Sequence, residues 1–253
     1  MAKVISISNQ KGGVGKTTTT CSLAAGLKKR GYRVLAIDLD PQGNLGFSVG
    51  ADSETSASIY DVLKGEVKTQ YAIQKTDSMD IIISSILLSG IELEFTNTGR
   101  EFLLKETIRP IQPFYDYILL DTPPALGILT INAFTASDTI IVPMLSDIFS
   151  LQGIAQLYET VERVKKYCNP NLSIAGILLT KFNPRTRLSR EVRGTAELIA
   201  NDLHIRLFDS YIRGSVSASE AQSLQQNVFD YDSRSHIAQD YGKLIDELLA
   251  KGV

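Results

Sequence analysis

The sequence predicts an α/β fold: one domain over residues 1–253, built on a mostly parallel, twisted sheet with helices on both faces. Short, almost wholly apolar runs alternate with segments of helical periodicity, which is the pattern of parallel strands buried on both faces. The strands end in loops rich in glycine, aspartate and threonine. With 253 residues, of which 43% are hydrophobic and 21% charged, the chain is long enough for one large α/β domain.

The first strand is expected over residues 3–8, and a helix over residues 17–29 follows it after a glycine-rich turn. Glycines in such a turn can adopt positive φ and direct backbone N–H groups around a phosphate chain. Lys16 would reach the β- and γ-phosphates, and the Thr17 hydroxyl would complete a Mg²⁺ shell. This is a P-loop pattern, and its expected nucleotide-binding residues are Gly12, Gly13, Val14, Gly15, Lys16, Thr17 and Thr18.

The next strand, residues 33–38, is nearly all apolar and delivers Asp38 to a loop that also holds Asp40. This loop lies where α/β proteins bind ligands. Two carboxylates near a triphosphate repel it unless a metal ion or water lies between, so each has a metal or water role if it faces the site. The alternative for Asp38 is that it caps the following turn.

Residues 53–110 carry no recognisable chemistry, and we expect helices over 58–64, 92–97 and 101–108 with a strand over 79–84. The strand ending at residue 121 then places Asp121 where a Walker B carboxylate holds Mg²⁺, here through a water. A helix over 126–136, a strand over 138–143, an amphipathic helix over 153–167 and a strand over 172–180 are expected next.

A basic cluster follows the last of these strands. Residues 181–193 hold five cations and one acid, whereas the whole chain has a net charge of −2. On a helix starting near residue 186 the arginines share an outer face, with Leu188, Val192 and Ile199 pointing inward. Such a surface attracts a phosphate backbone without reading bases, and the alternative is a solvated helix face. A last strand over 207–213 and a terminal helix docked on the core complete the chain.

Residues 11–18, Lys-Gly-Gly-Val-Gly-Lys-Thr-Thr, resemble the deviant Walker A motif of the ParA/MinD family of ATPases, and the following residues are most similar to its ParA/Soj branch. The resemblance runs from Lys3 to Leu249. It implies that Lys11 contacts the nucleotide held by the other subunit, so that ATP closes a face-to-face homodimer. It also implies that Asp38 supports the Mg²⁺ shell and Asp40 positions the attacking water.

The same resemblance assigns residues in the second half. It places a base contact at Asn183, where the family usually has an acid, and a second nucleotide-binding residue at Arg213, which is retained from a common Ile-Pro-Arg sequence. An arginine usual at position 217 is Ser217 here, which removes one expected DNA contact. The expected residues are therefore catalytic Lys11, Lys16 and Asp40; metal-binding Thr17, Asp38 and Asp121; and DNA-binding Arg185, Arg187, Arg190 and Arg193.

The resemblance implies a slow ATP hydrolase that uses ATP and Mg²⁺, binds DNA non-specifically as an ATP dimer and drives plasmid or chromosome partition, stimulated by a ParB-like partner. We expect a cytoplasmic, nucleoid-associated protein, since there is no cleavable apolar segment and the longest uncharged stretch, 122–137, is too polar to span a membrane. The alternative is a MinD-like or cargo-positioning ATPase acting on a membrane or protein scaffold. A membrane-binding form would need a basic amphipathic C-terminus, which the sequence lacks.

Overall fold

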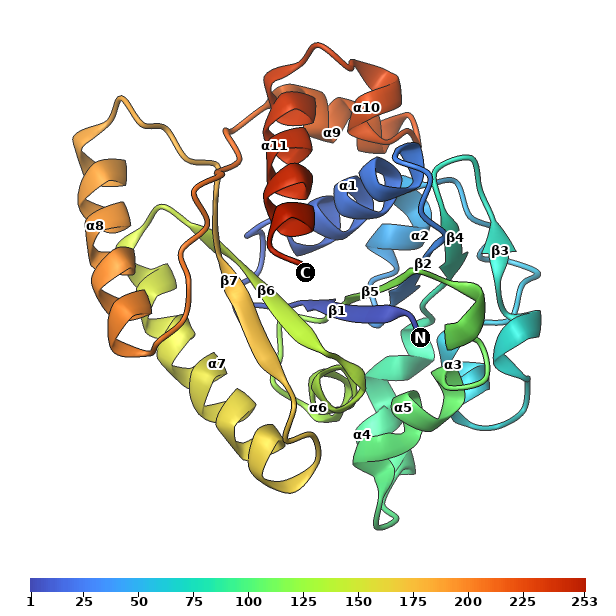
Figure 1. Ribbon diagram of the computed structural model, residues 1–253. Helices are drawn as coiled ribbons and strands as arrows, with labels where there is room; N and C mark the ends of the chain where they lie inside the picture. Colours follow the sequence, from blue (N-terminus) through green and yellow to red (C-terminus); the bar gives the residue numbers. More distant parts are fainter.

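One seven-stranded sheet organises the molecule (Figure 1). The computed structural model describes residues 1–253, apart from the side chains of residues 148, 149, 151 and 152. The strand order is β3-β4-β2-β5-β1-β6-β7, and every neighbouring pair is parallel except β3 and β4. The predicted mostly parallel sheet is confirmed. The strands are β1 (Lys3–Ile7), β2 (Val34–Asp38), β3 (Gln74–Lys75), β4 (Asp80–Ile82), β5 (Tyr117–Asp121), β6 (Thr139–Leu145) and β7 (Ser173–Thr180).

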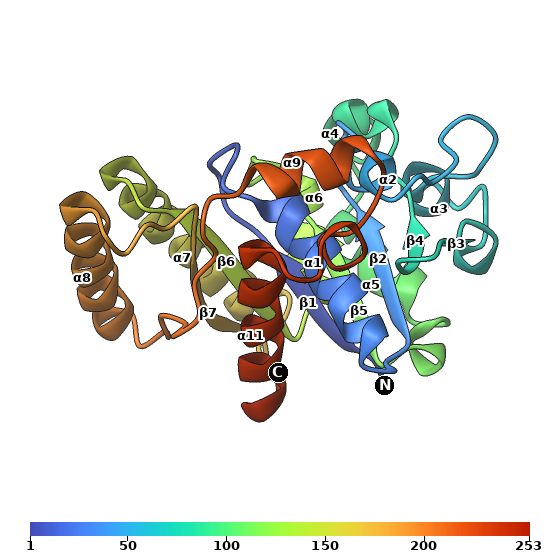
Figure 2. The same ribbon diagram turned by 90° about the horizontal axis from the view of Figure 1, so that it is seen from above.

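Helices cover both faces of the sheet, as Figures 1 and 2 show. One core lies under α1 (Lys16–Lys29), α2 (Asn44–Ser48), α9 (Val216–Ser223), α10 (Val228–Tyr231) and α11 (His236–Ala250). The other lies under α3 (Ile59–Leu63), α4 (Ile91–Glu94), α5 (Leu103–Ile108), α6 (Ile128–Ala136), α7 (Ile148–Tyr167) and α8 (Arg187–Asp202). Single 3₁₀ turns are η1 (Thr69–Tyr71), η2 (Ile86–Gly90), η3 (Arg100–Phe102) and η4 (Gln112–Phe114).

Successive residues of each central strand contribute to opposite cores. In β1, Val4 packs under the α3–α8 face while Ile5 packs under α1, and all but the first residue of the strand are buried. This explains the continuous apolar runs in the sequence, because both faces of a parallel sheet are covered. The carboxyl ends of these strands meet at one edge, where the functional loops lie.

The terminal helix α11 docks on α1, as expected from its apolar stripe, and residues 237, 241, 244, 245 and 248 are all buried. Gly26 of α1 faces side chains of α11 and α10. A Cβ built there would clash with Ile245 Cδ1 and lie 3.0 Å from the Phe229 ring. The absence of a side chain at position 26 therefore leaves room for these two side chains.

Several boundaries differ from those expected. Helix α7 begins at Ile148 rather than residue 153, because the Asp147 side chain caps it by accepting the Ser150 N–H. Helix α4 covers only Ile91–Glu94, and α5 starts at Leu103. The short elements α2, α10 and β3 were not expected, since so few residues give too little periodicity to identify an element. Helix α9 was not expected because its eight residues are mostly small or polar and form no apolar stripe.

The predicted last strand over residues 207–213 is wrong. The segment runs beside β7 and forms a single β-bridge, between Leu207 and Ile177. The ring of Phe208 packs over Gly176, where a Cβ would lie 2.9 Å from it. Phe208 and Ile212 are buried against the sheet edge, and their N–H groups donate to the Ile177 and Leu179 carbonyls. These contacts explain the strand-like pattern, but they are too interrupted to form a strand.

Substituting Gly26 with alanine tests this packing. Alanine favours a helix over glycine by about 1 kcal/mol, but overpacking a core costs about 1–3 kcal/mol, so Gly26→Ala should lower the free energy of unfolding in urea. The control is Gly194→Ala in α8, where a Cβ meets nothing within 4 Å. That variant should gain stability, and equal gains for both would contradict the tight α1–α11 contact.

Candidate functional site

A pocket of about 720 Å³ opens at the carboxyl edge of the sheet. The P-loop forms its floor, from Gly12 to Thr18, and Asp40 lies on one side. Lys181 and Arg213 lie on another side, and α9 covers part of it through Gln222, whose amide donates to Thr18 Oγ1 at 3.2 Å. Segments far apart in the sequence therefore converge on the residues that the P-loop pattern identified.

The loop geometry suits a bound phosphate. Gly13 and Gly15 have φ of 72° and 88°, values that disfavour any side chain, whereas Gly12 does not have positive φ. Helix α1 starts directly after Gly15 with no side-chain cap and no acid in its first turn. Its first N–H groups are thus available for an anion, and the helix dipole favours one there.

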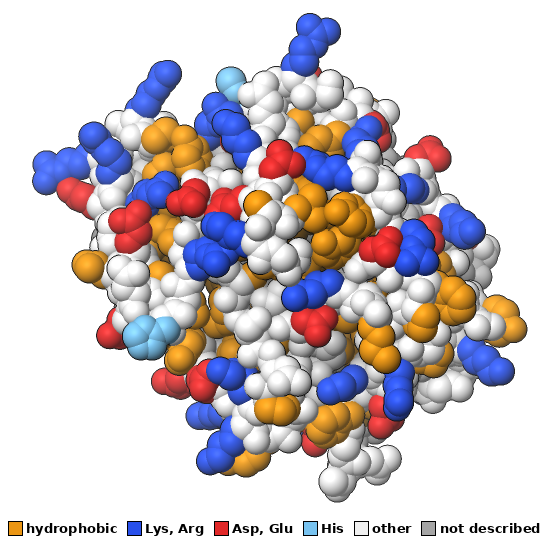
Figure 3. Space-filling model, viewed as in Figure 1, with side chains coloured by type: hydrophobic (Ala, Val, Ile, Leu, Met, Phe, Trp, Pro, Cys, Tyr) orange, Lys and Arg blue, Asp and Glu red, His pale blue; other side chains and the backbone are white. Residues whose placement is uncertain are grey.

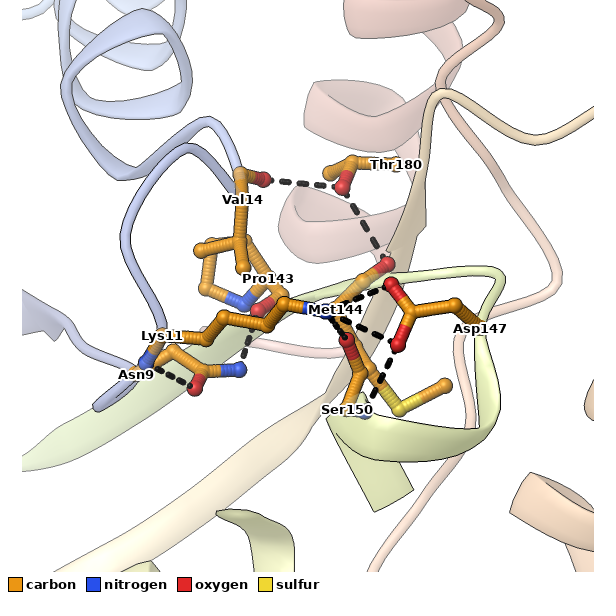
Figure 4. Close-up of polar contacts among 8 residues, drawn as sticks. All are labelled: Asn9, Lys11, Val14, Pro143, Met144, Asp147, Ser150 and Thr180. Atoms are coloured by element: carbon orange, nitrogen blue, oxygen red, sulfur yellow. Dashed lines mark hydrogen bonds and ion pairs between the residues drawn. The ribbon is translucent and has the colours of Figure 1, made fainter. Parts of the chain in front are cut away.

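The P-loop is fixed to the neighbouring strands, as the close-up in Figure 4 shows. The Thr180 hydroxyl at the end of β7 lies 2.8 Å from the Val14 carbonyl oxygen and 3.1 Å from that of Met144. The Asn9 amide donates to the Pro143 carbonyl at 2.7 Å, and Asn9 Oδ1 accepts the Lys11 N–H. These contacts fix the P-loop to β6 and β7.

Lys16 lies inside the pocket and is only 7% exposed. Its ammonium donates to the Lys11 carbonyl oxygen at 3.2 Å. Burial lowers the pKa of Lys16, against the opposing effect of the Asp121 and Asp40 carboxylates. A buried cation beside an open helix N-terminus is an arrangement that a phosphate group would complete.

Asp121 is fully buried at the end of β5, and its Oδ1 accepts from Thr20 Oγ1 at 3.2 Å. Its Oδ2 has no hydrogen-bond partner among the residues that the structure describes. Burial raises the pKa of Asp121 to about 7, despite the nearby Thr17 hydroxyl and Lys16 ammonium. An orphaned carboxylate oxygen beside Thr17 suits a water bound to Mg²⁺, so these residues fit the ion.

Asp38 faces Asp121 across the β2–β5 pair, yet its carboxylate is already occupied. Oδ1 accepts the Asp40 N–H at 3.1 Å, and Oδ2 accepts the Leu45 and Gly46 N–H groups at 3.0 and 3.3 Å. Burial and the facing carboxylate raise the pKa of Asp38 well above its usual value. The geometry therefore favours the capping alternative for Asp38, in which it shapes the loop that carries Asp40.

Lys11 lies outside the set of residues that line the pocket. Its ammonium donates to both carboxylate oxygens of Asp147, at 2.8 and 2.7 Å, and to Ser150 Oγ at 3.3 Å (Figure 4). Burial alone would raise the pKa of Asp147, but the Lys11 and Ser150 hydrogen bonds hold it below its usual value. The Lys16 ammonium therefore lies in the pocket, whereas the Lys11 ammonium lies outside it, against the first turn of α7.

The structure places one of the two nucleotide-binding residues expected in the second half of the chain in the pocket and the other outside it. Asn183 is exposed and does not line the pocket, because its side-chain oxygen accepts the Arg185 N–H in the turn before α8. Arg213 does line it and is held by the buried Asp240 of α11 through Nε at 2.9 Å and Nη2 at 2.7 Å. Lys181, with a positive φ of 49°, lines the pocket where Asn183 was expected to.

The basic cluster is exposed at the start of α8, and Figure 3 shows Lys and Arg side chains projecting from that corner of the molecule. Arg187 and Arg193 are each paired with an acid one turn on, Glu191 and Glu197. Arg185 and Arg190 have no ion pair among the described side chains.

Leu188 was expected to point inward but is 51% exposed, and Ser189 takes the buried position. The buried face of α8 consists of small side chains, at Ser189, Val192, Ala196 and Ala200. Because the prediction relied on large apolar side chains, it placed Leu188 rather than Ser189 on the buried face of α8.

Sequence reasoning missed Asp147, Asp240, Lys181 and Gln222. Asp147 followed by Ser150 is an N-cap pattern that would have moved the start of α7. No local pattern identifies Asp240 or Gln222, since their partners lie 27 and 204 residues away.

The two buried aspartates can be distinguished by substitution. Asp38→Asn leaves one backbone N–H facing an amide group, so we expect a loss of about 1–3 kcal/mol of unfolding free energy with little change in the Mg²⁺ requirement. Asp121→Asn should instead raise the Mg²⁺ concentration that gives half-maximal nucleotide binding. A larger Mg²⁺ shift in Asp38→Asn, with normal stability, would return Asp38 to the metal.

Known proteins are similar to this chain in sequence and in fold over nearly its whole length. A family model described as an AAA domain matches residues 2–174. The chain is 40% identical to the sporulation initiation inhibitor protein Soj of Bacillus subtilis, over all of both chains. It is 39% identical to the chromosome partitioning protein ParA of Caulobacter vibrioides, covering 98% of this chain and 94% of the relative.

Solved structures agree with this relationship. Cobyrinic acid a,c-diamide synthase of Mycobacterium smegmatis with bound ATP analogue and magnesium superimposes with a TM-score of 0.88 at 33% identity, covering 98% of this chain and 94% of that one. The septum site-determining protein MinD of Pyrococcus horikoshii, complexed with Mg-ADP, gives 0.80 at 25%, covering 98% and 96%. None of the described helices is both long and apolar enough to cross a bilayer. The chain belongs to the ParA/Soj branch of the ParA/MinD family of P-loop ATPases.

Proposed function

We propose that this chain is a Mg²⁺-dependent ATP hydrolase that dimerises when it binds ATP, binds DNA without sequence preference and drives plasmid or chromosome partition. A ParB-like protein would stimulate its slow hydrolysis, and its location would be the nucleoid. The observation that carries this proposal is the pair of P-loop lysines, one inside the pocket and one outside it. The names of the relatives, Soj and ParA, support the partition role.

The pocket residues suit ATP and Mg²⁺, which related structures hold as an ATP analogue or ADP with magnesium. The α1 N-terminus and Lys16 would bind the phosphates, while Thr17 and the free Oδ2 of Asp121 would hold the ion directly and through water. Mg²⁺ bound there would neutralise charge that develops on the phosphate oxygens.

Asp40 is the carboxylate best placed to orient an attacking water. It is 9% exposed, lines the pocket and is fixed at its backbone by Asp38 and at its side chain by the Gln42 N–H. A fixed carboxylate that keeps one oxygen free can align a water for in-line attack. Hydrolysis by the chain alone would be slow because its own cations would contact only part of the γ-phosphate. Binding of the ParB-like partner would then raise the rate of hydrolysis.

Dimerisation follows from the position of Lys11. Its ammonium lies outside this chain's pocket and its side chain is 34% exposed, so a nucleotide presented by a second copy could reach it in exchange for its contacts with Asp147 and Ser150. Joining two copies would also bring two basic α8 surfaces into one assembly. Twice as many phosphate contacts would strengthen DNA binding and steepen its salt dependence. DNA binding would then depend on the nucleotide, because the nucleotide controls dimerisation.

A MinD-like or cargo-positioning role remains the second candidate. The similarity to MinD at 25% identity and to the diamide synthase at 33% is lower than the 40% and 39% identity to Soj and ParA. The C-terminal helix α11 also buries its apolar face against α1, so that face is not free to bind a membrane.

The function is tested by measuring DNA retention with ADP and with a non-hydrolysable ATP analogue, each with Mg²⁺, at two salt concentrations. We expect retention only with the ATP analogue, on DNA of any sequence, and weaker at high salt. Arg185→Ala combined with Arg190→Ala should reduce the salt slope by about one for each phosphate that the variant chain no longer binds.

The matched control for that variant is Arg187→Ala combined with Arg193→Ala, since it removes the same charge from the same cluster but at arginines paired with Glu191 and Glu197. It should weaken DNA binding less. Equal retention in ADP and in the ATP analogue would argue against the nucleotide-switched dimer. Unchanged retention in the Arg185/Arg190 double variant would move the DNA surface away from α8.

A further inference from the structure

Lys11 is held within its own chain by a compact group of acceptors. Its ammonium lies within hydrogen-bond distance of Asp147 Oδ1, Asp147 Oδ2 and Ser150 Oγ (Figure 4). All three acceptors belong to the first turn of α7 or its cap. A phosphate group that approached the Lys11 ammonium would compete with these acceptors for it.

Asp147 is held in place independently of the lysine. It is the N-cap of α7, and its Oδ1 accepts the Ser150 N–H at 2.9 Å. A carboxylate at this position is also favoured by the helix dipole. On the other side, Asn9 binds the Lys11 N–H and the Pro143 carbonyl, which fixes the start of the P-loop on β6. Both ends of the Lys11–Asp147 pair are therefore set by the fold.

The pair is also open to exchange. The side chains of Lys11 and Asp147 are 34% and 31% exposed, and partly exposed ion pairs contribute little free energy because water and salt screen them. A triphosphate carries more negative charge than one carboxylate and offers several oxygens to an ammonium. A nucleotide that came within reach would therefore displace Asp147 from Lys11.

Resting on the dimer proposed above, we propose that Asp147 is a positioning residue for Lys11, which holds the ammonium against α7 and competes for it with the nucleotide of a second copy. The competition sets how much protein is needed before ATP closes the dimer. It also keeps Lys11 out of the chain's own pocket, where Lys16 already provides the cation.

The variant Asp147→Asn tests this proposal, because asparagine caps a helix about as well as aspartate but carries no charge. With a non-hydrolysable ATP analogue and Mg²⁺, sedimentation should give a dimer dissociation constant about two- to thirtyfold lower than that of the wild type, because the dimer breaks two exposed ion pairs, one in each copy. The difference should shrink at high salt, since salt screens the pair. Affinity of the monomer for nucleotide should stay the same.

A second measurement follows Lys11 directly and needs neither nucleotide nor dimer. In brief acylation with an amine-reactive ester, read by mass spectrometry, Lys11 should react several-fold faster in Asp147→Asn than in the wild type. The exposed Lys68 serves as the internal reference in the same sample. Asp147→Ala removes both charge and cap, so it should be less stable and yet show the same dimer shift as Asp147→Asn.

The outcomes separate the two proposals. A wild-type chain that stays monomeric with the ATP analogue at all concentrations would overturn both. A wild-type dimer with no shift in Asp147→Asn, or with weaker dimerisation in that variant, would overturn the role of Asp147 alone. A shift seen only in Asp147→Ala would mean that the cap, not the charge, matters, and would also overturn it.

Discussion

The open N-terminus of α1 is the constraint on which the site depends. The helix starts at Lys16 with neither a side-chain cap nor an acid, directly after a glycine held at positive φ. Such a terminus has backbone N–H groups that need an acceptor, and the buried Lys16 ammonium adds a cation beside them. A phosphate group satisfies both, and the surrounding contacts to β6 and β7 hold the loop ready for it.

The carboxylates of Asp38, Asp40 and Asp121 have different roles because their burial and their hydrogen-bond partners differ. Asp38 uses both oxygens on backbone N–H groups, whereas Asp121 leaves one oxygen without a partner among the described residues. Asp40 depends on Asp38 for its place in the pocket. Three acids within one site therefore act as a loop cap, a candidate metal ligand and a candidate holder of water, although all three end or follow the same kind of buried strand.

Sequence reasoning succeeded where a pattern is local. The P-loop, the buried strands ending at Asp38 and Asp121, and the stripe of α11 each occupy a short run with a fixed period or spacing. It failed where partners are distant or elements are short. Asp147 and Asp240 act on residues in other elements, and the 207–213 segment has a strand's composition but pairs with β7 too irregularly to form a strand. Asn183 was placed by analogy, and its side chain instead shapes the turn before α8.

We expect Lys16 to bind the nucleotide of its own chain and Lys11 to bind the nucleotide of the second copy. Nucleotide binding to the monomer tests this division most directly. A calorimetric titration with the ATP analogue and Mg²⁺, at a protein concentration below that of dimerisation, would compare Lys16→Ala with Lys11→Ala. We expect loss of binding in Lys16→Ala and wild-type affinity in Lys11→Ala. Equal losses in both variants would contradict this division, because Lys11 would then bind the nucleotide of its own chain.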